Sequence, residues 1–218
     1  MHHIAPDVQA LATAAVKTPP QPNRPNGRDG SHHDLWRGFN PYCPALEHAK
    51  RAVADWYTDG LDRGQALVLS GPPGTGKTHL ALVVLAAYGA PHQAWMISEA
   101  DMVANLRSSY QGGGRSTEQM IIAQYRRAPL LILDDVGVAY VKSDSQGWIE
   151  DIYWRIFDRR AELRLGTLIT TNLSFADLPG RLGSRAFSRL CGAMGGTKEL
   201  IKENLVSLAG VEDYRRRR

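Results

Sequence analysis

The stretch Gly71-Pro72-Pro73-Gly74-Thr75-Gly76-Lys77-Thr78 decides the fold of this chain. It matches the pattern G-x-x-x-x-G-K-[ST], in which glycines let the backbone bend until successive N–H groups face one concavity and bind phosphate oxygens. Lys77 is placed to reach the β- and γ-phosphates, and the Thr78 hydroxyl is a ligand for Mg²⁺. We therefore predict that these eight residues bind ATP and that the cofactors are ATP and Mg²⁺.

The residues on either side of this loop support the same prediction. Ala66–Ser70 is a short apolar run between glycines, which predicts a buried strand. Lys77–Tyr88 is apolar nearly all round, which is typical of a helix packed inside an α/β protein, and Gly89 should end it. A Gly/Pro-rich turn that binds nothing is the alternative, and it does not require a strand before the loop and a helix after it.

A second acidic element is needed to hold magnesium beside such a loop. Leu130-Leu131-Ile132-Leu133-Asp134-Asp135 supplies four apolar residues for a buried strand and two carboxylates at its C-terminal end. This is a Walker B pattern. We expect Asp134 to hold Mg²⁺ through water and Asp135 to polarise the attacking water. Asp135 is one methylene shorter than the Glu that many such ATPases carry, which favours slow hydrolysis or a switch role.

A third strand and a series of arginines follow. Thr167–Thr171 predicts a strand that ends at Asn172, whose side chain would orient the lytic water. Arg181, Arg185 and Arg189 recur every four residues and should share one helix face. That face is either a solvated surface or the source of an arginine finger for a neighbouring subunit's γ-phosphate.

The motifs GPPGTGKT, LLILDD, TLITTN and RxxxRxxxR, in this order, resemble AAA+ ATPases. More narrowly they resemble the DnaC/IstB group of replicative-helicase loaders and IS21-type transposition helpers. The lead-in Phe39–Leu46 and the ending Leu208–Arg215 are similar to that group as well. The resemblance implies an α/β P-loop NTPase of the ASCE type: a three-layer parallel sheet with helices on both faces. We expect no sizeable C-terminal lid, because no room remains for one.

The resemblance also implies roles and partners. Asn172 would be the sensor residue, and Arg185 or Arg189 the finger, in a homo-oligomer with shared ATP sites. The implied function is ATP hydrolysis to ADP and phosphate, coupled to loading a replicative helicase on DNA, with single-stranded DNA expected. Two alternatives remain: a transposition helper that recruits a transposase, and an ATP-gated binding switch with little turnover. A small-molecule P-loop kinase fits poorly, because Asn172 and the arginines have no role in one.

Composition agrees with a soluble, cytoplasmic ATPase. The chain has 218 residues, 43% hydrophobic and 22% charged, which suits one α/β domain. No apolar run is long enough to span a bilayer, and Met1–Ile4 lacks the features of a secretory signal. Cys43 and Cys191 have no metal-like spacing, so we expect them reduced. The net charge of +4 permits nucleic-acid binding without demanding it.

The chain divides into two parts. Residues 1–34 should form a flexible tail and linker, because 18–30 are rich in Pro, Asn and Gly. Residues 35–218 should form the ATPase domain, with no contact to a membrane. The basic residues that could face DNA are local, and solvated helix ends are the alternative for each: Arg107, Arg115, Arg126, Arg127 and Arg215 to Arg218.

Overall fold

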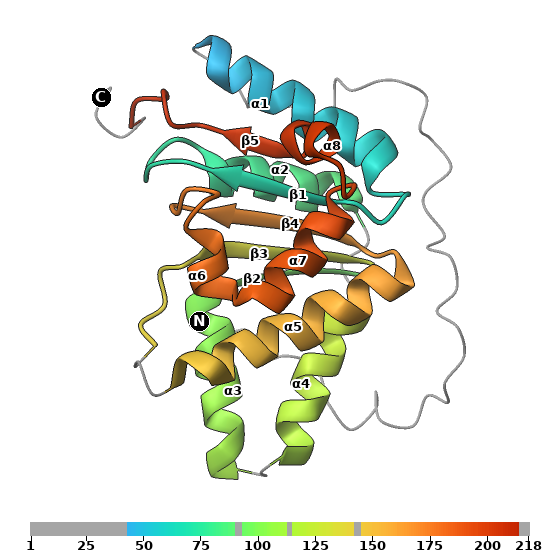
Figure 1. Ribbon diagram of the computed structural model, residues 1–218, viewed down its shortest axis with the longest axis vertical. Helices are drawn as coiled ribbons and strands as arrows, with labels where there is room; N and C mark the ends of the chain where they lie inside the picture. The colour runs from blue at the N-terminus through green and yellow to red at the C-terminus, as the bar shows by residue number, and fades with distance from the viewer. Residues whose placement is uncertain (1–42, 90–92, 113–114, 142–144, 214–218) are drawn as a thin grey trace.

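The computed structural model describes residues 43–89, 93–112, 115–141 and 145–213. Five parallel strands form one sheet in the order β2-β3-β4-β1-β5 (Figure 1). The strands are β1 (Ala66–Ser70), β2 (Ala94–Ser98), β3 (Leu130–Val136), β4 (Gly166–Thr171) and β5 (Leu205–Ser207). All of the strands predicted from the sequence are present, and β4 lies between the strand that precedes the P-loop and the strand that carries the Walker B carboxylates.

Helices cover both faces of the sheet, as predicted. One face packs against α3, α4, α5, α6 and α7, and the other against α1, the π-helical turn η1 and α2. The bounds are α1 Pro44–Asp55, η1 Trp56–Gly60, α2 Lys77–Tyr88, α3 Glu99–Gly112, α4 Arg115–Arg127, α5 Gln146–Leu163, α6 Leu178–Leu182, α7 Ser184–Ala193 and α8 Lys198–Glu203. In Figure 1, α3 and α4 extend side by side beyond the edge strand β2.

Two apolar cores result from the alternation of side chains along each strand. Val68 and Leu133 belong to the core under α5, whereas Leu69 and Ile132 belong to the core under α2. These strand side chains of both cores are fully buried, because a parallel sheet has helices on each face. Burial of the whole strand explains why these segments are continuous apolar runs in the sequence.

Two helix ends form as the residue types predict. The Ser98 hydroxyl accepts a hydrogen bond from Asp101 N at 3.1 Å and caps the start of α3. Gly89 ends α2 with φ of 65°, in the left-handed region that favours glycine. Ser98 therefore marks the start of α3, and Gly89 marks the end of α2.

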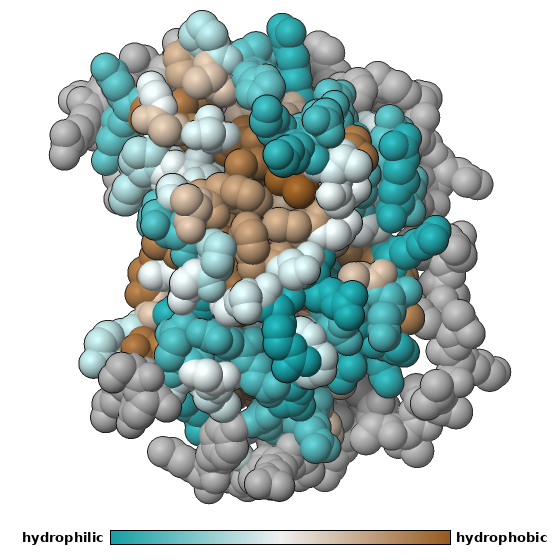
Figure 2. Space-filling view, viewed as in Figure 1, coloured by the Kyte–Doolittle hydropathy of each residue, from teal (hydrophilic) through white to brown (hydrophobic). Residues whose placement is uncertain are grey.

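One face of the molecule carries partly exposed apolar residues near α7. Phe187, Ile201 and Leu205 are partly buried against the core, and Leu200 is 36% exposed. Figure 2 shows apolar surface gathered over the region of α7, α8 and β5. The predicted tail, residues 1–34, and the start of the predicted ATPase domain lie outside the described residues. After β5, residues 208–213 contain no helix.

Candidate nucleotide-binding site

The P-loop folds over the N-terminus of α2. Lys77 Nζ donates hydrogen bonds to Gly71 O and Pro72 O, each at 2.8 Å, so the ammonium group lies across the loop. The Thr75 hydroxyl donates to Pro72 O at 2.9 Å and is buried. Gly76 has φ of 93° and precedes the first turn of α2. The loop therefore presents N–H groups, a lysine and a helix N-terminus together, which is the chemistry that binds phosphate.

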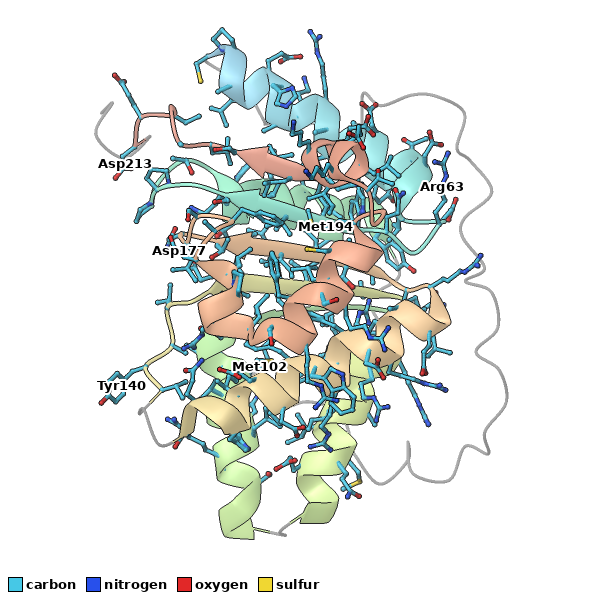
Figure 3. All side chains as sticks on the ribbon, viewed as in Figure 1. Arg63, Met102, Tyr140, Asp177, Met194 and Asp213 are labelled. Atoms are coloured by element: carbon cyan, nitrogen blue, oxygen red, sulfur yellow. The ribbon has the colours of Figure 1, made fainter. Side chains whose placement is uncertain are left out.

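The segment that follows β5 reaches this loop. Gly74 has φ of 77°, and a Cβ atom there would overlap the Asp213 carboxylate. Figure 3 shows Asp213 on the same side of the molecule as Tyr140 and Asp177, with Arg63 on the opposite side. The left-handed backbone conformation thus favours glycine at position 74, and a larger residue there would also displace the Asp213 side chain.

Thr78 and Asp134 meet at the edge of the sheet. Thr78 Oγ1 donates to the Asp134 carboxylate, 3.0 Å from Oδ1 and 3.2 Å from Oδ2, although the residues are 56 positions apart. Thr170 Oγ1 also donates to Asp134 Oδ1, at 2.6 Å. A hydroxyl and a carboxylate are the hard oxygen ligands that Mg²⁺ takes beside nucleotide phosphates. These residues therefore fit the ion that the sequence predicts.

Asp135 lies at an irregularity of β3. The register with β4 shifts between Leu133 and Val136, and Asp135 has φ of 53°, which few residues other than glycine adopt. Its backbone N donates to Thr170 Oγ1 at 2.9 Å. A bulge redirects the side chain at that position, and backbone strain of this kind is concentrated at functional sites.

Asn172 follows β4 directly and its side chain is exposed. The tips of the neighbouring strands are tied together around it. Ser70 Oγ donates to Leu173 O and Thr171 Oγ1 donates to Val136 O, both at 2.6 Å. The structure thus brings Asn172 to the edge of the sheet that carries Lys77 and the two carboxylates.

The three arginines do not share one helix face, so that prediction was wrong. Arg181 lies on α6, and Gly183 (φ 78°, ψ 149°) separates α6 from α7, which carries Arg185 and Arg189. The chain turns at Gly183, which ends the four-residue periodicity. Arg185 Cζ lies 4.0 Å from the centre of the Trp154 ring, and Arg189 Nε lies 2.8 Å from Asp158 Oδ1. Both partners belong to α5 of the same chain.

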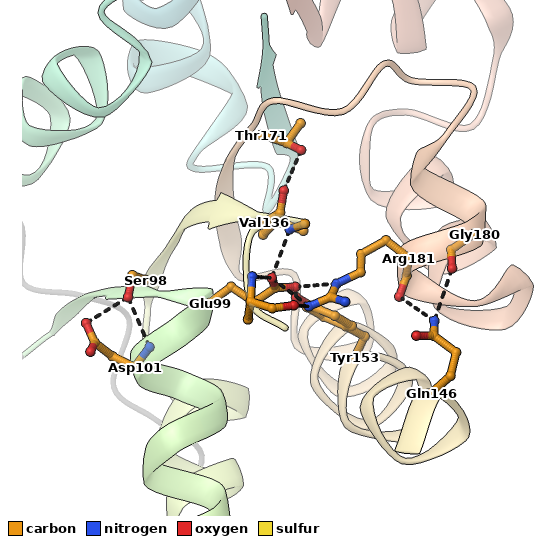
Figure 4. A network of polar contacts seen from close by, with 11 residues as sticks. Ser98, Glu99, Asp101, Val136, Gln146, Tyr153, Thr171, Gly180 and Arg181 are labelled. Carbon is orange, nitrogen blue, oxygen red and sulfur yellow. Dashed lines mark hydrogen bonds and ion pairs between the residues drawn. The ribbon is translucent and has the colours of Figure 1, made fainter. Parts of the chain in front are cut away.

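Arg181 instead joins a buried network that the sequence did not reveal (Figure 4). Its Nε and Nη2 lie 2.7 Å from Glu99 Oε1 and Oε2, and the Glu99 side chain is fully buried. Tyr153 OH also donates to Glu99 Oε1. Glu99 follows β2 and begins α3, so in the sequence it resembles an ordinary acidic residue in a first helical turn.

The pKa values of this network follow from its burial and charges. Burial raises the pKa of the Tyr153 hydroxyl well above its ordinary value, and the negative charge of Glu99 adds to the effect. Burial would lower the pKa of Arg181, but its hydrogen bond and charge interaction with Glu99 outweigh that and raise it. Tyr153 is therefore a neutral donor and Arg181 a permanent cation.

The basic residues predicted to face DNA lie in different environments. Arg107 is exposed on α3, with Cζ 6.0 Å from the centre of the Trp148 ring. Arg127 is exposed at the end of α4, whereas Arg126 is partly buried, and burial lowers its pKa. The side chain of Arg115 and residues 215–218 lie outside the described part of the chain.

A comparison with protein-family models matches residues 45–191 to the family described as IstB-like ATP binding protein. The chain belongs to this family. The match spans more than half of the chain and includes the P-loop, both carboxylates, Asn172 and both arginines of α7. ATP binding is the property that the family description states, and it agrees with the geometry of residues 71–78.

Relatives of this IstB-like chain carry two kinds of name. It is 28% identical to "Replicative helicase loader DnaC" of Buchnera aphidicola subsp. Baizongia pistaciae over 148 residues, covering 66% of this chain and 58% of the relative. It is 30% identical to "Insertion sequence IS21 putative ATP-binding protein" of Pseudomonas aeruginosa over 118 residues, covering 54% and 42%. The chain thus spans little more than half of the length of the DnaC relative.

The fold of the IstB-like chain is similar to that of a solved structure. The crystal structure of the DnaC helicase loader superposes with a TM-score of 0.60 at 22% identity, covering 82% of this chain and 98% of that chain. This likeness supports the three-layer P-loop architecture. No helix among the described residues is long and apolar enough to cross a membrane. The described residues also contain no cluster of three or more His, Cys, Asp or Glu side chains that could hold a metal ion by themselves.

Proposed function

We propose that this IstB-like chain is an ATPase that loads a replicative helicase onto DNA in the cytoplasm. The observation that supports it most directly is the contact of Thr78 with Asp134, 3.0 Å apart beside Lys77 at one edge of the sheet. That contact joins the P-loop to the Walker B strand. The DnaC names of the relatives favour helicase loading over other uses of an ATPase.

ATP would supply the γ-phosphoryl group, whose transfer to water gives ADP and phosphate, and Mg²⁺ would neutralise the charge on the phosphates. The backbone of residues 71–78 and the N-terminus of α2 bind the phosphates. Lys77 would turn from its contacts with Gly71 O and Pro72 O to neutralise phosphate charge, and Thr78 and Asp134 would hold the ion. The lysine is thus already at the site and needs only a rotation of its side chain.

Asp135 and Asn172 would orient the attacking water. Asp135 lies near the end of β3 and Asn172 directly follows β4, and Asp135 N donates to Thr170 Oγ1 of β4. A carboxylate there accepts a proton from water, and an amide aligns the water with the γ-phosphate. At Asp135 the strand is irregular, since the register of β3 with β4 shifts between Leu133 and Val136.

A neighbouring subunit would complete the site with Arg189 or Arg185. Both are exposed on α7, next to the partly exposed apolar residues Phe187 and Leu200. Apolar surface beside a cationic helix suits subunit packing. The contacts with Trp154 and Asp158 hold the arginines on their own subunit, and a neighbour's γ-phosphate competes for them.

The test is binding to the helicase and turnover in its presence. The full chain is immobilised and challenged with the replicative helicase of the same host and, separately, with an IS21-type transposase. We expect helicase capture in ATP and hydrolysis that rises when helicase and single-stranded DNA are added. Lys77→Ala should abolish both the ATP-dependent capture of the helicase and the stimulated ATP hydrolysis. Absence of helicase capture in every nucleotide state contradicts the loader function.

A transposition helper is the second candidate. The family description and the Pseudomonas aeruginosa relative both favour it. It would assemble on duplex DNA and bind a transposase. Capture of the transposase, with hydrolysis stimulated by duplex DNA and not by helicase, decides for this alternative. Both candidates use the same ATP site, so the nucleotide chemistry does not distinguish them.

A further inference from the structure

The buried network centred on Glu99 holds the loop that follows the Walker B carboxylates. Gly137 N and Ala139 N both donate to Glu99 Oε2 at 2.9 Å. Arg181 Nη2 donates to Ala139 O, also at 2.9 Å. Three backbone groups of the loop, from Gly137 and Ala139, are therefore bonded to two side chains that come from α3 and α6.

The carboxylate has its full set of donors. Glu99 accepts from two backbone amides, from the Tyr153 hydroxyl and from both arms of the Arg181 guanidinium. A buried charge is tolerated only when it is paired and hydrogen-bonded in this way. An arrangement with so many bonds has one low-energy geometry, so the loop backbone is held in one place.

The position of the loop matters because of what lies on each side of it. Asp135, the residue proposed to polarise water, is two positions before Gly137 and has a strained backbone (φ 53°). Upstream, its N–H is held by Thr170. Downstream, Val136 O accepts a hydrogen bond from Thr171 Oγ1, and Gly137 N then donates to Glu99. Without the bond to Glu99, the backbone after Val136 loses its tie to α3, and the loop next to Asp135 can move.

The other end of the network reaches the arginine helix. Arg181 is on α6, and α7 with Arg185 and Arg189 begins at Ser184. A Cβ at Gly183 would lie 2.8 to 2.9 Å from Glu150 side-chain atoms, so the turn between the two helices is closely packed on α5. A displacement of the loop is thus passed to α6 through Arg181 and to the start of α7 through this turn.

We propose that Glu99 and Arg181 are positioning residues for ATP hydrolysis, which fix the Asp135 loop and set the orientation of the arginine helix α7. The inference rests on the proposed ATPase function and extends it. The network acts after nucleotide binding, because neither residue contacts the P-loop residues that bind phosphate in the described structure. Loss of the network should therefore lower the rate of ATP hydrolysis and leave ATP affinity nearly unchanged.

The principal variant is Glu99→Leu/Tyr153→Phe/Arg181→Leu. Replacing a buried ion pair by apolar residues leaves no uncompensated charge, so the fold is retained. We expect ATP affinity within about 3-fold of wild type, since phosphate binding is untouched, and kcat lower by about 10- to 100-fold, since misplacement by about 1 Å costs that much. Amide hydrogen exchange of residues 137–141 should accelerate.

Two milder variants should lower kcat by smaller factors than the principal variant. Arg181→Lys keeps the positive charge but cannot bond both carboxylate oxygens and Ala139 O in one plane, so kcat should fall by an intermediate factor. Tyr153→Phe leaves every loop bond in place and should lower kcat least. If the principal variant does not fold, the proposal is tested by comparing kcat of Arg181→Lys with kcat of Tyr153→Phe.

The matched control is Glu118→Leu/Arg155→Leu. This pair joins α4 to α5 with Arg155 Nη1 2.9 Å from Glu118 Oε1, and both side chains are largely buried. This pair is not part of the Glu99 network, so its replacement should leave kcat and loop exchange unchanged. An equal fall of kcat in control and test shows a general packing effect and overturns the proposal.

The outcomes separate this inference from the proposed function. If wild type hydrolyses ATP and the principal variant hydrolyses it at the same rate despite faster loop exchange, the positioning role is wrong and the ATPase stands. If wild type binds ATP without any turnover under all DNA and helicase conditions, the ATPase function itself is wrong, and with it the role of the network in hydrolysis.

Discussion

Lys77 and Asp134 have different proposed roles in ATP hydrolysis, and their contacts in the structure differ accordingly. Lys77 bonds to carbonyl groups of the P-loop, where phosphates bind. Asp134 bonds to Thr78 and Thr170, where the metal ion is expected. One residue is thus tied to nucleotide affinity and the other to magnesium-dependent turnover, which mutations distinguish.

Lys77→Ala should lower both ATP affinity and hydrolysis, because it removes the point charge that faces the β- and γ-phosphates. Asp134→Asn should lower turnover more than affinity, because its amide still accepts from Thr78 but carries no charge for Mg²⁺. Titration with a fluorescent ATP analogue and a phosphate-release assay measure the two effects. Lys198→Ala, at an exposed lysine of α8, is the control. Wild-type turnover in Lys77→Ala would rule out the P-loop function.

Asp135→Asn should bind ATP and fail to release phosphate, so that the protein accumulates as an ATP-bound assembly. The physical reason is that an amide cannot accept a proton from the attacking water. Size-exclusion chromatography with ATP, together with the nucleotide content of the eluted peak, measures the accumulation. Undiminished phosphate release from this variant would show that Asp135 is not the base, and the ATP-gated switch would gain support if wild type were also inactive.

Elements of this fold are joined by buried side chains as well as by the sheet. Arg160 of α5 is 2% exposed and bonds to the Thr167 hydroxyl and to three backbone carbonyls, of Tyr125, Ala128 and Gly166. It joins the end of α4 and the start of β4 to α5. Burial lowers its pKa to about 9, which is still high enough for a cation at neutral pH.

Arg160→Met should therefore destabilise the protein by about 3 kcal/mol or more, because it leaves buried carbonyl groups without donors. For a protein of this size that corresponds to a fall in Tm of roughly 6–12 °C. Arg159→Met is the control: its exposed pair with Glu162 contributes at most about 1 kcal/mol. Thermal unfolding followed by circular dichroism measures both. Equal Tm values for the two variants would contradict the role of Arg160 in joining these elements.

The whole molecule offers its ATP site and its arginine helix on different surfaces. Arg185 and Arg189 contact α5, not the P-loop of their own chain. If Arg185 or Arg189 acts on a γ-phosphate, we propose that the phosphate is bound by a second copy of the chain. This geometry supports an assembly in which each site is shared between neighbours, with apolar surface near α7 in the contact.

Arg189→Ala should leave the fold and basal ATP binding intact while abolishing DNA-stimulated hydrolysis, since a finger is worth about 10³-fold or more in turnover. Mixing Arg189→Ala with Lys77→Ala should restore part of the activity, because each variant supplies the half-site that the other lacks. The measurement is phosphate release across mixing ratios, with Arg185→Ala tested in the same way. Two variants that stay inactive at every ratio, in a protein that remains monomeric with ATP and DNA, would refute the shared site.

The local elements of this protein were predictable from its sequence because local patterns carry them. The P-loop is a contiguous motif, and the apolar runs at 66–70 and 130–133 became buried strands because a parallel sheet is covered on both faces. The helix ends at Ser98 and Gly89 depend on single residue types. The expectation that Asp134 lies near Thr78 also followed, since strand ends of a parallel sheet converge at one edge.

Only the tertiary structure decided the partners of Arg181 and the existence of the Glu99 network. Arg181 and Glu99 are 82 positions apart, and no periodicity in the sequence connects them. The four-residue spacing of the arginines predicted one helix, but Gly183 divides it and directs Arg181 to a different surface from Arg185. Long-range charge pairing depends on which elements the sheet order brings together, and that order is a property of the packed molecule.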